Sequence, residues 1–107
     1  MSDERANRRL QMLEQKIAAG AQDPFIFYAR ALELRSLGQL TTALEALTEV
    51  EQRFPEYVPT FLMAGQIAAQ VGEVERARGF LQRGLAVATG QGDEHARSEL
   101  QQALDSL

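Results

Sequence analysis

The chain has 107 residues, of which 45% are hydrophobic and 24% are charged, and its net charge is −4. This composition is typical of one packed domain spanning residues 1–107, and it excludes an intrinsically disordered chain. The absence of cysteine excludes disulfide scaffolds and thiol catalysis, and the acidic balance argues against a nucleic-acid partner.

The first segment predicted to be helical covers residues 3–19. Leu10, Leu13 and Ile17 recur there at helical spacing and form one apolar stripe. The chain contains no run of about 20 apolar residues, and charged side chains interrupt every N-terminal stretch that would otherwise resemble a signal peptide. We therefore expect a cytoplasmic protein with no membrane partner.

Residues 24–57 predict two helices with a turn between them. Asp23 is a typical N-cap residue, and the proline that follows it suits the first position of a helix. Gly38 is expected to end this first helix, because glycine adopts the left-handed conformation found after a helix C-terminus. Thr42 and Glu45 have the spacing of a capping box for the second helix.

Residues 58–91 repeat this pattern after a shift of 34 positions. The size of the side chain is kept at the apolar positions, and the two turn glycines fall in phase. The matched pairs are Phe27 with Phe61, Ala31 with Gly65, Gly38 with Gly72, Ala43 with Ala77, and Leu47 with Leu81. Two copies of one helical hairpin are therefore expected to lie side by side.

Residues 94–106 predict a trailing helix, which Asp93 is placed to cap. Leu100 and Leu104 belong to its apolar stripe. Together the segments predict an all-α fold of about six helices: one leading helix, two antiparallel pairs and one trailing helix.

This period resembles the tetratricopeptide repeat, a helix–turn–helix unit of 34 residues. The first unit matches the family pattern of aromatic residue, small residue, turn glycine, second-helix alanine and terminal proline at Phe27, Ala31, Gly38, Ala43 and Pro55. The second unit matches at Phe61, Gly65, Gly72 and Ala77. It has Thr89 in place of the proline, and Arg30 of the first unit stands where the family usually has an aliphatic residue. The resemblance implies a right-handed α-solenoid of antiparallel helix pairs.

The resemblance also implies a concave groove, lined by the first helix of each pair, that binds a peptide or a partner helix. The candidate partner-binding residues in this register are Phe25, Tyr28, Leu32, Arg35, Leu62, Gln66, Ala69 and Gln70. Some family members grip a C-terminal carboxylate with lysine and asparagine, but neither residue type stands at the matching positions here. Two interpretations stay open: the stripe packs against an end helix as core, or it supplies the apolar anchors of a groove.

The sequence contains no recognisable catalytic or metal-binding arrangement. His95 is the only histidine, and Glu73 and Glu75 lie in a turn and at a helix start, where carboxylates favour the helix dipole. We therefore expect no enzyme activity, no cofactor and no metal. The predicted function is a non-catalytic interaction module for a protein or peptide partner. The alternative is a self-associating repeat protein, such as a homodimer, suggested by the short array and the apolar Leu104 and Leu107.

Overall fold

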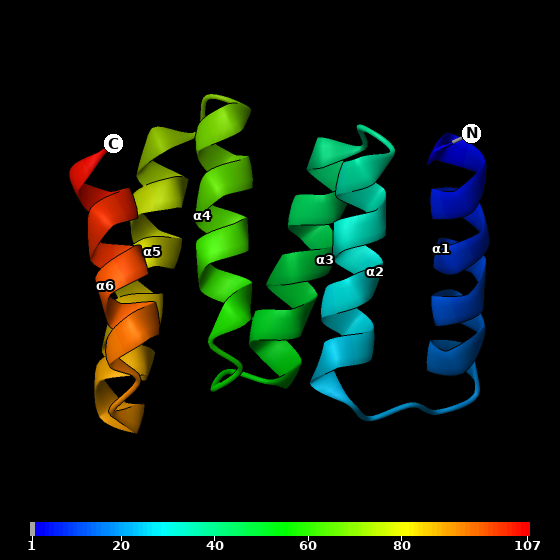
Figure 1. The fold of residues 1–107 in the computed structure, drawn as a ribbon, viewed down its shortest axis with the longest axis horizontal. Coiled ribbons are helices and arrows are strands. Elements are labelled where there is room, and N and C mark those ends of the chain that lie inside the picture. Colours follow the sequence, from blue (N-terminus) through cyan, green and yellow to red (C-terminus); the bar gives the residue numbers. More distant parts are fainter. Residues whose placement is uncertain (1) are drawn as a thin grey trace.

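The structure is a computed structural model that describes residues 2–107, and within that range it consists of α-helices without strands. The helices are α1 (Ser2–Ala18), α2 (Pro24–Ser36), α3 (Leu40–Arg53), α4 (Pro59–Gln70), α5 (Val74–Gln91) and α6 (Glu94–Asp105). Successive helices run in opposite directions (Figure 1). The predicted all-α fold of six helices is confirmed for the described residues.

Most of the predicted helix ends are present in the structure. The Asp23 side chain accepts a hydrogen bond of 2.9 Å from the backbone N–H of Phe25, and Asp93 accepts one of 3.1 Å from that of Ala96. Gly38 and Gly72 follow α2 and α4 with φ of 77° and 86°. Other residue types rarely adopt this left-handed conformation, so glycine allows the sharp turn into the next helix at both places.

The capping box predicted at Thr42 and Glu45 is wrong. Helix α3 already begins at Leu40, and its N-cap residue, Gln39, makes no capping hydrogen bond through its side chain. The backbone N–H of Ala43 donates to the carbonyl oxygen of Gln39 over 2.9 Å, so the helical ladder starts before Thr42. The turn at Gly38 sets this start, and Thr42 therefore lies inside the helix.

Small residues allow the helices of each pair to pack closely. Ala31 of α2 and Ala43 of α3 are fully buried. In the second pair, a Cβ atom added to Gly65 would lie 2.5 Å from Cδ2 of the buried Leu81, so only glycine leaves room for that leucine. Gly65 therefore allows α4 to approach α5 closely.

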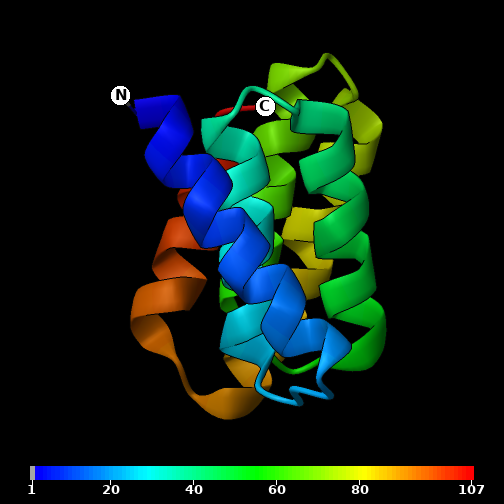
Figure 2. The same ribbon diagram turned by 90° about the vertical axis from the view of Figure 1, so that its right-hand side faces the viewer.

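The helices form three layers when the molecule is viewed from its α1 end (Figure 2). Helices α2 and α4 lie in the middle, α3 and α5 lie to the right, and α6 lies to the left. Helix α4 packs against α3, α5 and α6, and α1 packs against α2. The face of α2 and α4 that points away from their partners α3 and α5 is therefore the face that α6 borders.

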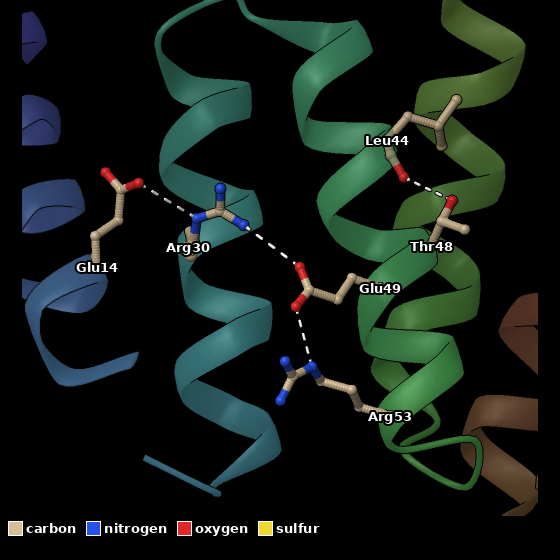
Figure 3. Close-up of polar contacts among 6 residues, drawn as sticks. All are labelled: Glu14, Arg30, Leu44, Thr48, Glu49 and Arg53. Carbon is tan, nitrogen blue, oxygen red and sulfur yellow. Dashed lines mark hydrogen bonds and ion pairs between the residues drawn. The ribbon is translucent and has the colours of Figure 1, made fainter. Parts of the chain in front are cut away.

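Ion pairs connect α1 to the first helix pair. Arg30 of α2 lies between Glu14 of α1 and Glu49 of α3, with N–O distances of 3.7 and 3.9 Å (Figure 3). Glu49 also pairs with Arg53, at 3.0 Å. This arrangement explains why an arginine is tolerated at position 30: it lies between two carboxylates at the junction of three helices.

Candidate functional site

The predicted partner-binding residues lie on α2 and α4, and none of them is fully buried. Phe25, Arg35, Gln66 and Gln70 are exposed, and the phenylalanine leaves 55% of its surface accessible. The other four residues are partly buried: Tyr28, Leu32, Leu62 and Ala69. We refer to these eight positions as the groove stripe. A large exposed aromatic side chain and partly buried neighbours are compatible with a contact surface on α2.

Tyr28 is the aromatic residue at the centre of the α2 part of the stripe. Its ring contacts that of Tyr57, from the segment between α3 and α4, edge-on with the centroids 5.7 Å apart. Burial raises the pKa of Tyr28 above 10.0 and Tyr57 raises it further, while the charge of Arg35 acts in the opposite direction. The phenol is therefore uncharged at neutral pH, and it presents an apolar ring with one hydroxyl group.

A pocket of about 330 Å³ opens beside Tyr28. Its walls come from α2, the start of α4 and the first half of α6. Apolar side chains dominate the lining, notably Leu62 and Met63 of α4 and Ala96 and Leu100 of α6. Carboxylates of Asp93 and Glu99 also border it. The structure thus brings two stripe residues, Tyr28 and Leu62, to one concave site.

Helix α6 covers part of the α4 half of the stripe. Leu62 and Gln66 line a small pocket between α4 and α6. Gln66 and Ala69 line a second pocket of about 340 Å³, which Leu107 also borders. Phe25, Leu32, Arg35 and Gln70 line none of these pockets. The α4 half of the stripe therefore lies partly against the trailing helix, while Phe25 stays exposed on α2.

Several site residues were missed in the sequence. Met63 lines the pocket, and its Sδ accepts a hydrogen bond of 3.1 Å from Nη1 of Arg35. The α6 residues Asp93, Ala96 and Glu99 were also missed. A helical period indicates which residues of α6 share a face, but it does not indicate which other helix that face meets.

The charged residues considered for chemistry lie on the surface. The side chain of His95 is 88% exposed, and its Nε2 lies 3.2 Å from Oε1 of Glu99. Glu73 pairs with Arg76 and Glu75 pairs with Arg78, at 3.6 and 3.5 Å. Within residues 2–107, no group of three or more histidine, aspartate or glutamate side chains is arranged to hold a metal ion. No described helix combines the length and apolar character needed to cross a bilayer.

Residues 34–104 match the family model described as tetratricopeptide repeat. No curated protein matches the chain. The chain is similar to the crystal structure of a tetratricopeptide repeat domain protein from Salinibacter ruber, with 30% identity and a TM-score of 0.74. That match covers 78% of this chain and 93% of the other.

Two chaperone structures resemble it in fold at lower identity. The type III secretion translocator chaperone SycD from Yersinia enterocolitica has 12% identity and a TM-score of 0.85, covering 96% of this chain and 79% of its own. PcrH, solved in complex with the chaperone binding region of PopB, has 16% identity and a TM-score of 0.73, covering 97% and 98%. At these low sequence identities, the two comparisons show a shared fold.

Proposed function

Because the chain belongs to the tetratricopeptide repeat family, we propose that it is a non-catalytic interaction module that binds a peptide or helix of a partner protein along α2, α4 and α6. The observation that carries the proposal is the apolar pocket beside Tyr28 and Leu62. At about 330 Å³ it lies at the small end of the range of ligand pockets. It is suited to one anchoring side chain of a longer segment.

The groove stripe supplies the surface on either side of that anchor. Phe25 is exposed three residues before Tyr28 in α2, which is one helical turn away. Interface binding energy is concentrated in a few aromatic or aliphatic anchors surrounded by weaker contacts. A partner segment that inserts one side chain beside Tyr28 would cover Phe25 in the same contact.

The structural comparisons support a protein partner. PcrH has the same fold and was solved in complex with the chaperone binding region of PopB and, in another structure, with that of PopD. This chain and PcrH align over nearly their whole lengths. By analogy, we assign to this chain the general role of binding a segment of another protein.

Site-specific photo-crosslinking tests the proposal. A benzoylphenylalanine is placed at Phe25 or Gln66 in the groove stripe, and as a matched control at Gln82, an exposed position on α5. In extract of the source cells, the two stripe positions should crosslink the same partner and Gln82 should not. Equal crosslinking from Gln82, or from none of the three positions, contradicts binding along this face.

Alanine substitutions at Tyr28 and Leu62 measure how much each side chain contributes to the affinity for the partner. Tyr28→Ala and Leu62→Ala should each weaken binding of the crosslinked partner by about 5- to 30-fold, corresponding to about 1–2 kcal/mol. Helical circular dichroism should remain, because both side chains are only partly buried. Binding that is unchanged in both variants would contradict the pocket as the anchor site.

Self-association is the second candidate function, and exposed apolar residues favour it. Met12 of α1 is 55% exposed and Leu107, after α6, is 37% exposed, so each end of the helix stack presents an apolar side chain. The SycD structure of the same fold is described as an alternative dimer. Sedimentation velocity across a hundredfold range of concentration tests this candidate, and a strict monomer throughout would rule it out.

A further inference from the structure

The pocket beside Tyr28 is apolar inside and acidic on one side only. Asp93 and Glu99 border it from α6 together with His95, and none of the described residues that line it is arginine or lysine. The apolar interior selects for an apolar side chain. The acidic border favours a positive charge on the residue of the bound segment that lies next to that side chain.

Glu99 is the carboxylate with the greater freedom to pair with a partner. Its side chain is 48% exposed, and its Oε1 lies 3.2 Å from Nε2 of His95, which also lines the pocket. Asp93 uses one carboxylate oxygen to cap α6, where it accepts from the N–H of Ala96. Glu94, one residue further on, is already paired with Arg97 at 3.0 Å and does not line the pocket.

A positive charge lies near the pocket, although it is not part of the lining. Arg35 contacts Met63, which lines the pocket, and lies seven residues beyond Tyr28 on α2. Seven residues of helix correspond to about 10 Å. A bound segment therefore meets negative charge towards α6 and positive charge towards the end of α2, which favours one orientation of its own charges.

We propose that the partner segment inserts one large aliphatic or aromatic side chain into this pocket and that a neighbouring lysine or arginine of the segment pairs with Glu99. This inference rests on the proposed function and specifies the chemistry of its partner. Charge complementarity at the acidic border is the argument for it, and Asp93 contributes as the second carboxylate.

A phage-displayed library of random 12-residue peptides is the probe. Peptides selected on the wild-type protein should share a large apolar residue with lysine or arginine within four positions of it. Synthetic versions are then titrated by fluorescence anisotropy. Glu99→Gln should weaken binding about fivefold, as for loss of a partly exposed ion pair, and should reduce its salt dependence.

Three control measurements test whether Glu99 itself pairs with the basic residue of the peptide. Glu94→Gln removes the same charge from the same helix away from the pocket and should leave the affinity unchanged. Asp93→Asn keeps an oxygen to cap α6 and should weaken binding less than Glu99→Gln does. A peptide whose basic residue is replaced by glutamine should bind Glu99→Gln and wild type equally, as a double-mutant cycle requires for a direct pair.

The outcomes separate this inference from the proposed function. Selected peptides that need Leu62 but show no basic preference, or that bind Glu99→Gln as tightly as wild type, overturn the inference and leave groove binding intact. Selection that yields no peptide sensitive to Leu62→Ala contradicts the proposed function itself.

Discussion

Individual glycines determine how closely the helices of the second pair approach. Leu81 fills the space beside Gly65, and its side chain is 1% exposed, so it has no room to move aside. Gly84 of α5 has the same role toward Phe61 of α4 and Leu100 of α6. At both positions the missing side chain is what allows a large neighbour to be buried.

Gly65→Ala should destabilise the protein even though alanine favours helix. Overpacking against Leu81 costs about 1–3 kcal/mol, and the gain in helix propensity returns up to about 1 kcal/mol. We expect a net loss of about 1–2 kcal/mol in the free energy of unfolding, measured by urea denaturation.

Gly90→Ala is the matched control for this prediction. Gly90 is also within a helix, α5, but a Cβ atom there would meet nothing within 4 Å. The substitution should leave stability unchanged or raise it by a few tenths of a kcal/mol, roughly as expected near a helix end. If the two alanine variants had equal stability, close packing at Gly65 would be refuted.

Among the elements, α2 depends most clearly on its cap. The Asp23 carboxylate accepts a hydrogen bond from the N–H of Phe25, and Pro24 removes a second N–H that would otherwise need a partner. Helix α2 carries the aromatic part of the groove stripe. The start of this helix therefore fixes where Phe25 and Tyr28 are placed.

Asp23→Ala should lower the free energy of unfolding by about 1 kcal/mol, because the N–H of Phe25 loses its acceptor. Asp23→Asn keeps an acceptor oxygen and should retain most of the stability. Chemical denaturation of the three proteins under one buffer condition compares them. A loss as large for asparagine as for alanine would show that the charge of Asp23, rather than its hydrogen bond, matters.

The whole molecule is a stack whose middle is better buried than its N-terminal end. Six residues of α4 are buried, whereas among the described side chains of α1 only Ala6 is. The main packing partner of α1 is α2, while α4 packs against three helices. In stacked repeats the stability of each unit depends on its neighbours, so the two helices should open with different free energies.

Hydrogen exchange followed by mass spectrometry measures this difference directly. Backbone amides of α1 should exchange through local opening well before those of α4, whose exchange should approach the global unfolding limit. Adding a peptide that occupies the groove should slow exchange in α2 and α6. Identical opening free energies for α1 and α4 would mean that the chain unfolds as one cooperative unit.

The elements that local chemistry specifies were predictable from the sequence. Asp23, Gly38, Gly72 and Asp93 act within a turn of their own positions, so their roles follow from neighbouring residues alone. Thr42 was misassigned because its spacing fits a capping box while the turn at Gly38 starts the helix earlier. The repeat boundaries at 24–57 and 58–91, and the role of the groove stripe, stay predictions.

The sequence by itself determined that this chain forms six helices with a repeated hairpin, because a 3.6-residue period and helix caps are properties of short segments. Only the tertiary structure decided that α6 lies against α4 and closes a pocket with Tyr28. Residues 28 and 99 are far apart in the chain, and their approach depends on how helices cross. That crossing is set by side-chain volume at contacts such as Gly84 with Phe61 and Leu100, which no local pattern specifies.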